Sequence, residues 1–292
     1  MRLRFETGGA LTDLEEAVRV CRESVEATPE DDPRYPYYAS TLGGALQVRA
    51  ERKDSAPDLE AAVVALRAAV RIAGDGHPDW AMFGSNLAGA LQARPDLAPA
   101  TGHDPATDPV EPTGHDPATD PVEPTGLGEA IDLLRRTVKT AAPGHPRLGQ
   151  YWNNLSNALL DRFEAAGEPG DLQEAVRACR NAVSVTPADQ PGRAAILVNA
   201  ARALQTAGRA EEALRHAEQA LDLETAPATW RLRAAWRAGD IALTAQPERA
   251  AQFLERAVRL LPEISPATCG ARTSSTPSAG PAGWSPTRPR SL

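Results

Sequence analysis

The segment Leu42-Gly-Gly-Ala-Leu-Gln47 recurs three more times along the chain. The copies are Leu87-Ala-Gly-Ala-Leu-Gln92, Leu155-Ser-Asn-Ala-Leu-Leu160 and Ala200-Ala-Arg-Ala-Leu-Gln205. The alanines at the fourth position of these segments, which we call anchors, are separated by 45, 68 and 45 residues. A fixed period of this size indicates a solenoid, in which each repeat packs on its neighbours and the array presents a binding surface.

A second segment recurs at the same steps, which indicates two helices in each repeat. Its copies are Leu14-Glu-Glu-Ala17, Leu59-Glu-Ala-Ala62, Leu127-Gly-Glu-Ala130 and Leu172-Gln-Glu-Ala175, with looser copies at Ala213 and Ala250. Leucines and small residues stand at helical spacing in both. We expect five nearly complete helical hairpins after a lone second helix. Arg4-Phe5-Glu6 aligns with Arg162-Phe163-Glu164 at the end of a first helix, so the chain is expected to begin inside a repeat.

The second helices carry start and stop signals at fixed positions. An Asp or Gly suited to an N-cap stands four residues before the alanine that ends each second segment, at Asp13, Asp58, Gly126 and Asp171. Glu16 and Glu174 follow three residues after their caps, which resembles a capping box. Prolines twelve or thirteen residues after these alanines should end four of the second helices, at Pro29, Pro143, Pro187 and Pro262. Gly74 should end the helix that contains Ala62.

One repeat is interrupted by a duplicated acidic segment. Residues 102–113 are followed at once by an identical copy, residues 114–125, and removing these 24 residues brings the long step close to its neighbours. Prolines and carboxylates there cannot bury apolar area. We predict a helical array over residues 1–264, a disordered acidic Pro-rich loop over 95–125, and a disordered tail rich in Ser, Pro, Thr, Gly and Arg over 265–292.

The composition excludes several classes of partner. The net charge is −8 and the isoelectric point is about 5.3, which gives no basic footprint for nucleic acid. No apolar run is long enough to cross a bilayer, and the first residues do not resemble a secretion signal. The sequence therefore predicts a cytoplasmic protein that binds neither nucleic acid nor membrane.

No arrangement of residues indicates catalysis, a metal or a cofactor. Cys21 and Cys179 occupy one equivalent position, filled elsewhere by Leu66, Leu134 and Ala217, so core packing is favoured over a reactive role. Cys269 stands in the tail with no histidine beside it. The histidines read as loop residues or as part of the duplication, and no phosphate loop or hydrolase motif is present. We expect a protein that is not an enzyme.

The aromatic residues are expected to pack rather than to bind. Trp152 and Trp236 each stand six residues before an alanine, Ala158 or Ala242, which predicts one shared core position. Tyr35 and Trp80 share another register at the opening of their helices. For that second pair, packing is preferred over partner contact.

The stretch from Ala203 to Glu224 resembles a tetratricopeptide (TPR) repeat. The matching residues are Ala201, Gly208 in the turn, Ala213 and Ala220. The earlier units have a longer loop, as in Arg162-Phe-Glu-Ala-Ala-Gly-Glu-Pro-Gly-Asp-Leu172, and resemble the long TPR arrays that precede caspase-like CHAT protease domains in bacteria. The resemblance implies an all-α, right-handed superhelical solenoid of antiparallel helical hairpins.

A polar strip on the first helices is the candidate binding site, because in TPR proteins these helices line a concave groove. Amides and hydroxyls at helical spacing can bond the backbone of an extended peptide. The strip lacks the lysine-rich clamp with which some TPR proteins bind a C-terminal carboxylate. The alternative to a binding role is that these residues form an ordinary solvated helix face. The expected partner-binding residues are Ser40, Gln47, Ser85, Gln92, Asn153, Asn157, Arg202 and Gln205.

Two hypotheses for function follow. The first is a non-enzymatic scaffold that binds a peptide or protein segment in the concave groove. The second is the truncated N-terminal regulatory arm of a larger CHAT-type protease, inactive by itself. The chain has two lysines against 29 arginines, which indicates a GC-rich gene, and back-translating the tail in a shifted frame with GC-rich codons can give a helical sequence; we therefore hypothesise a frameshift near Pro266. A catalytic helical array is the least favoured reading.

Overall fold

The computed structural model describes residues 11–93 and 126–264, and within these ranges it contains eleven helices and no strand. The duplicated segment, the tail with Cys269, and Arg4-Phe5-Glu6 lie outside the described residues. The helices are α2 (Leu11–Glu26), α3 (Tyr35–Lys53), α4 (Ala56–Ala73), α5 (Trp80–Gln92), α6 (Gly126–Thr140), α7 (Leu148–Ala166), α8 (Pro169–Val185), α9 (Arg193–Thr206), α10 (Ala210–Asp222), α11 (Ala228–Ala242) and α12 (Pro247–Ile264).

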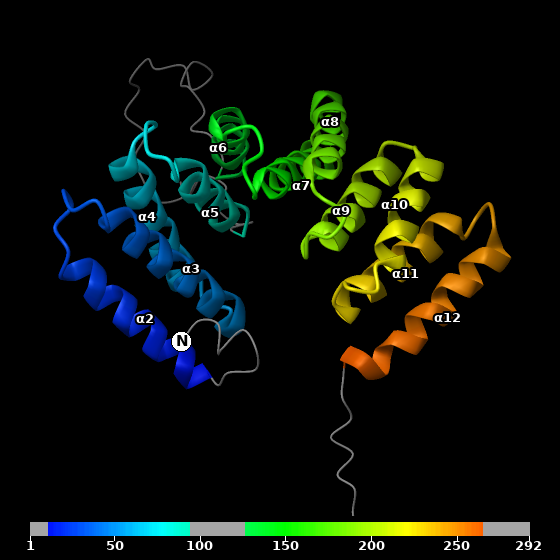
Figure 1. The fold of residues 1–292 in the computed structure, drawn as a ribbon, viewed down its shortest axis with the longest axis horizontal. Helices are drawn as coiled ribbons and strands as arrows, with labels where there is room; N and C mark the ends of the chain where they lie inside the picture. The colour runs from blue at the N-terminus through cyan, green and yellow to red at the C-terminus, as the bar shows by residue number, and fades with distance from the viewer. Residues whose placement is uncertain (1–10, 94–125, 265–292) are drawn as a thin grey trace, which may run out of the picture.

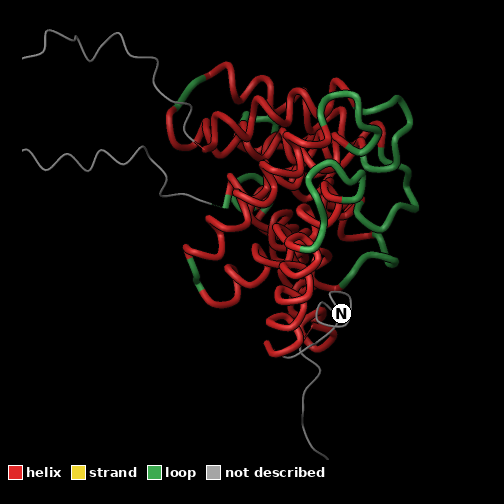
Figure 2. The backbone as a smooth tube through the Cα atoms, turned by 90° about the vertical axis from the view of Figure 1, so that its left-hand side faces the viewer, coloured by secondary structure: helices red, strands yellow, loops and turns green. Residues whose placement is uncertain are grey.

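Within the described residues, the helices form a superhelical arc of five hairpins preceded by helix α2. The hairpins are α3–α4, α5–α6, α7–α8, α9–α10 and α11–α12, and α2 packs against α3. The first helices of successive hairpins also contact one another, along the inner side of the arc in Figure 1. In Figure 2 the loops that join one hairpin to the next gather along one edge.

Small residues at the repeated alanine positions of the first and second helices let the two helices of a hairpin approach closely. Ala62, Ala90, Ala130, Ala158 and Ala203 are fully buried. Close contact extends to neighbouring positions, because a Cβ added to Gly43 would lie 2.4 Å from Leu66 Cγ on the facing helix. Cys179 and Trp80 are buried, while Cys21, Tyr35 and Trp152 are half-buried and packed against the core, so the packing interpretation is confirmed for all five.

The predicted aspartate caps are wrong, since these residues lie inside their helices. Asp58 and Asp171 each accept two hydrogen bonds from an arginine nine residues earlier, Arg49 or Arg162, on the first helix of the same hairpin. Ser55 caps α4 instead by accepting from the Asp58 amide. A charge-assisted bidentate pair is stronger than a cap bond, and here it ties the two helices of a hairpin together.

The glutamates of the predicted capping boxes also bond elsewhere. Glu174 accepts from Arg135 on the preceding second helix, at 3.0 and 2.7 Å, and Glu16 accepts from Arg19. The Arg135 to Glu174 pair recurs between other second helices in the same register, as Arg67 with Glu129 and Arg180 with Glu212. These pairs form a row of ion pairs that links successive second helices.

The predicted ends of the second helices at prolines are confirmed, except at Pro262. Helices α2, α6 and α8 end before Pro29, Pro143 and Pro187, but α12 continues through Pro262 to Ile264. A proline lacks the N–H that would donate to the carbonyl four residues earlier, so a helix that runs through a proline loses one backbone hydrogen bond. Pro262 is the third residue from the end of α12, and only Glu263 and Ile264 continue the helix beyond it.

The core position predicted for Trp236 is wrong, because its side chain is 66% exposed. On α11, Gly239 packs against Leu254, as Gly43 packs against Leu66 in α3–α4. That correspondence makes Ile241, not Ala242, the structural anchor of α11. With the register moved by one residue, Trp236 takes the position of Ser40, Ser85 and Asn153 on the inner face, while Trp152 faces the core.

Candidate functional site: an inner face lined by side-chain amides

Side-chain amides link the first helices along the inner face. Asn86 Nδ2 donates to Ser40 Oγ at 3.0 Å, and Asn154 Nδ2 donates to Ser85 Oγ at 3.1 Å. Asn199 Nδ2 donates to Asn153 Oδ1 at 3.0 Å. Each donor stands four residues before its anchor, and each acceptor stands five before the anchor of the preceding hairpin. We call Asn86, Asn154 and Asn199 the inner amide row.

The inner amide row keeps hydrogen-bonding capacity that the array does not use. Asn86 is exposed, and Asn154 and Asn199 are half-buried. An asparagine amide has two N–H donors and a carbonyl acceptor, and the bond along the row takes one donor. The Asn154 carbonyl also accepts from Asn153 Nδ2 at 3.4 Å, which leaves it one lone pair. The spare groups repeat at the spacing of the hairpins, so they offer alternating donors and acceptors to whatever lies along the inner face.

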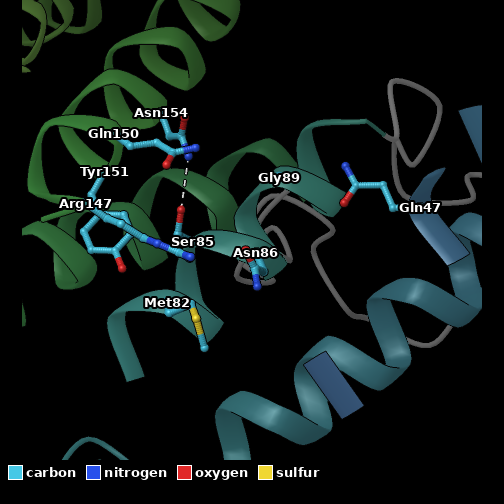
Figure 3. Close-up of a pocket in the computed structure, with 9 residues that line it drawn as sticks. All are labelled: Gln47, Met82, Ser85, Asn86, Gly89, Arg147, Gln150, Tyr151 and Asn154. Carbon is cyan, nitrogen blue, oxygen red and sulfur yellow. Dashed lines mark hydrogen bonds between the residues drawn. The ribbon is translucent and has the colours of Figure 1, made fainter. Parts of the chain in front are cut away.

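A pocket of about 180 Å³ opens beside the row between α5 and α7. We call it the central pocket, and Figure 3 shows its side chains from three helices. Gln47 reaches it from α3, and Gly89 leaves space there, since an added Cβ would come no closer than 3.9 Å to Gln47 Nε2. The remaining lining residues are Met82, Ser85, Asn86, Arg147, Gln150, Tyr151 and Asn154.

The Tyr151 hydroxyl in the central pocket lacks a partner. Its ring is buried and stacks on His145, but its oxygen forms no hydrogen bond with any described residue. Burial raises the pKa of this hydroxyl above its ordinary 10.0, while Arg147 lowers it and Asp79 raises it. The group therefore carries its proton at neutral pH, and its oxygen is buried with no acceptor for that proton among the described residues.

The residues predicted for the binding strip lie on or beside this face, with different exposures. Ser40, Ser85 and Asn153 are buried and act as acceptors for the inner amide row. Gln47 lines the central pocket. Arg202 donates to Asp161 and Glu164, and Gln205 bonds Asp240 and Arg237. Gln92 and Asn157 are half-buried.

Sequence reasoning missed the inner amide row itself. The more open side chains belong to the residues after Ser40, Ser85 and Asn153, and the prediction did not include Tyr151, Arg147 or Gln150. The signal that could have found the row is an asparagine at one fixed distance from three successive anchors, Ala90, Ala158 and Ala203.

Other groups in the described ranges show no chemistry beyond structure. His77 Nδ1 and His145 Nδ1 accept backbone amides two residues later, at 3.0 and 3.1 Å. Burial raises the pKa of the Cys179 thiol to about 11. Among residues 11–93 and 126–264, no three His, Cys, Asp or Glu side chains gather in a way that could hold a metal ion. No described helix is long and apolar enough to span a bilayer.

Several solved structures share this architecture at low sequence identity. An array of nearly identical TPR-like repeats from Podosopora anserina, assigned as a kinesin light chain, has 20% identity and a TM-score of 0.53, covering 78% of this chain and 97% of that one. The fold is that of a TPR-like solenoid. YrrB, a TPR protein with an unusual peptide-binding site, has 14% identity and a TM-score of 0.50, with 84% and 94% covered.

A longer structure contains the same fold as a part. A chain of the Cut9–Hcn1 hetero-tetramer of the APC/C has 14% identity and a TM-score of 0.55, covering 86% of this chain and 38% of that one. No protein-family model and no curated protein matches the sequence. The TPR interpretation of the repeats is confirmed at the level of the fold, while the CHAT resemblance stays a prediction.

Proposed function

We propose that this protein is a non-enzymatic scaffold that binds an extended peptide or protein segment along its inner face. The observation that carries the proposal is the inner amide row beside the unpaired Tyr151 hydroxyl of the central pocket. An extended backbone presents carbonyl acceptors and amide donors at regular intervals. Side-chain amides complement both without demanding a particular side chain.

The unpaired hydroxyl gives the central pocket a reason to take up a ligand. A buried polar group without a partner costs about 1–3 kcal/mol. A peptide carbonyl that accepts from Tyr151 would relieve that cost, once the side chains that cover the buried hydroxyl oxygen move aside on binding. Arg147, which forms no ion pair with a described carboxylate, and Gln150 supply further donors at the same place. The pocket therefore suits a hydrogen-bond acceptor.

The neighbouring folds fit this use of the surface. YrrB is a TPR protein with a peptide-binding site, and the Cut9 chain belongs to a multi-protein assembly. We carry from them only the general mode, in which a helical array holds a protein segment. The −8 net charge and the absence of a membrane-spanning helix among the described residues accord with a protein partner.

A selection experiment with a matched control tests the proposal. Random peptides displayed on phage would be selected on the full chain, and the affinity of the selected peptides measured by calorimetry. Asn86→Asp with Asn154→Asp should weaken binding by about tenfold or more, because the spare amide donors are lost. Val64→Asp, at a 68% exposed position on α4, should leave binding unchanged. Equal binding by all variants would contradict an inner-face site.

The alternative function, a regulatory arm of a larger CHAT-type protease, would use the same inner face for a different purpose. It remains a prediction from the resemblance of the longer repeats. Sequencing the gene beyond the codon for Pro266 tests it. A reading frame for a protease domain with a His and Cys pair would support it, and a stop-rich frame would count against it.

A further inference from the structure

A second pocket, of about 480 Å³, opens on the inner face between α9 and α11. We call it the aromatic pocket. In the structural register of α11, it repeats the central pocket two hairpins further along. Trp230 stands eleven residues before the Ile241 anchor, as Arg147 stands eleven before Ala158. Trp236 and Arg237 follow the positions that hold Asn153 and Asn154 in α7. The same framework therefore carries different chemistry at this end of the array.

Two tryptophans supply the apolar part of the aromatic pocket. Trp236 is 66% exposed, the second most exposed of the large apolar side chains among the described residues. Trp230 is half-buried, and the Arg233 guanidinium lies over its ring at 4.8 Å from the centroid. A guanidinium held on an aromatic face keeps its N–H edges directed outward. The pocket thus combines an open indole surface with a fixed cation.

The arginines of the aromatic pocket have no carboxylate partner among the described residues. Arg237 Nη1 donates to Gln205 Oε1 at 3.1 Å, and Gln205 Nε2 donates to Asp240 Oδ2 at 2.8 Å. Gln205 therefore stands between Arg237 and the nearest acid. Elsewhere on α9, Arg202 is neutralised by two carboxylates, at 3.0 and 2.6 Å. Arg233 and Arg237 retain donors suited to bidentate carboxylate binding.

We infer that the aromatic pocket binds an acidic peptide segment with one large apolar side chain, which seats against Trp236 while flanking carboxylates bind Arg233 and Arg237. The inference rests on the proposed function and names the partner's chemistry at this end of the groove. Apolar contact on an exposed indole and paired guanidiniums are the features that dominate interface energetics. The two arginines set the acidic requirement, and the indole sets the apolar one.

Charge favours a short acidic segment over a nucleic acid. The chain carries a net charge of −8, and Asp240 borders the pocket. Asp161 and Glu164 on α7 form ion pairs with Arg202 on α9. Within the aromatic pocket the basic groups are the Arg233 and Arg237 guanidiniums, which match a pair of carboxylates but not an extended polyphosphate. A single-stranded nucleic acid would meet repulsion on leaving the pocket.

Fluorescence anisotropy with a labelled peptide, Gly-Ser-Glu-Asp-Phe-Glu-Asp-Ser-Gly, tests the inference on the full chain. Arg233→Glu with Arg237→Glu, and separately Trp236→Ser, should each raise the Kd by about thirtyfold. Replacing the peptide phenylalanine by serine should weaken binding as well, and a peptide with lysines in place of the acids should not bind. Arg215→Glu, at an exposed position on α10, is the matched charge control and should bind as the native chain does.

Further measurements separate this inference from the proposed function. Tyr151→Phe should leave the acidic peptide's Kd unchanged, and Trp236→Ser should retain binding of phage-selected peptides that depend on Asn86. Thermal unfolding of each variant identifies loss of fold, and Arg233→Gln with Arg237→Gln provides a milder test. No binding of the acidic peptide by the native chain, binding unaffected by the Trp236 and arginine variants, or tighter binding of oligo-dT would each overturn the inference.

Discussion

Asn154 on α7 donates its side-chain amide to the Ser85 hydroxyl on α5, 69 residues earlier in the sequence, across 3.1 Å. The same bond joins Asn86 to Ser40 and, with an asparagine acceptor, Asn199 to Asn153. Each bond fixes one first helix against the next, since a buried acceptor such as Ser85 needs its donor. The first helices are therefore fixed to one another along the inner face. The remaining donors and acceptors of the same asparagine amides can bond a partner.

Tyr151→Phe should stabilise the free protein. The substitution removes a buried hydroxyl that has no partner among the described residues while it keeps the ring that stacks on His145. We expect the free energy of unfolding to rise by about 1 kcal/mol, measured by urea denaturation. The same variant should bind groove peptides more weakly than the native chain. A loss of stability would mean that the hydroxyl is satisfied in solution.

Asp171→Asn should destabilise the protein by about 2 kcal/mol, because it leaves the Arg162 guanidinium without its bidentate partner. The Asp171 side chain is 8% exposed, and hydrogen bonds from Arg162 lower the pKa of its carboxyl. Asp132→Asn is the matched control, since that carboxylate is 69% exposed and its pair with Arg135 should contribute under about 0.5 kcal/mol. Equal effects would contradict the assignment.

The stability that the Arg162–Asp171 pair contributes depends on pH, because the pair lowers the pKa of the Asp171 carboxyl in the folded state. A carboxyl with a lowered folded-state pKa stabilises the fold above its unfolded pKa, near 4, and loses that contribution as the pH falls. The native chain should therefore lose stability below about pH 4 more steeply than Asp171→Asn. Denaturation midpoints between neutral pH and acid would show the difference. Parallel curves would argue against the pair.

The row of ion pairs on the second helices reverses its polarity once, and this gives a charge-swap prediction. Arg249 on α12 pairs with Glu218 on α10, in the register where Arg180 pairs with Glu212. Glu218→Arg alone should cost about 0.5–1 kcal/mol through like-charge contact. Adding Arg249→Glu should restore most of that loss. A double-mutant cycle by thermal denaturation measures the coupling, and strict additivity would refute it.

Cys179 should be unreactive while the protein is folded. Its thiol is buried and donates to the Val176 carbonyl at 3.2 Å, and burial raises its pKa from 9.0 to about 11. In a Cys21→Ser, Cys269→Ser chain, an aromatic disulfide reagent at pH 8 should react only after unfolding. Because the unfolded thiol ionises first as pH rises, stability should fall above pH 9. Rapid reaction of the folded chain would contradict the packing role.

Much of the fold could be predicted from the sequence because it depends on local patterns. The anchors recur at a fixed period, as in the 45-residue steps from Ala45 to Ala90 and from Ala158 to Ala203, and only small residues suit a close helix crossing. Partners across a hairpin could not be predicted in the same way. Whether Asp171 caps its own helix or bonds Arg162 depends on the angle between the two helices, which no spacing in the sequence sets.

Two members of the inner amide row, Asn86 and Asn154, stand one residue after the predicted Ser85 and Asn153, and that one residue decides which side chain is buried. Ser85 and Asn86 are adjacent on α5, and only the packing of α7 shows that the first is buried and the second exposed. The error at Trp236 has the same origin. Ile241 and Ala242 are both apolar and buried, so the sequence could not tell which of them is the anchor of α11.

Nuclear magnetic resonance of the side-chain amides shows directly whether the inner amide row contacts a bound peptide. The ¹⁵N-labelled chain would be titrated with a phage-selected peptide and the Asn86, Asn154 and Asn199 side-chain signals assigned by substitution. We expect these signals to shift with the peptide while the backbone amides of the exposed faces of α4 and α8 do not. Shifts confined to those second helices, with the asparagine signals unmoved, would contradict that contact.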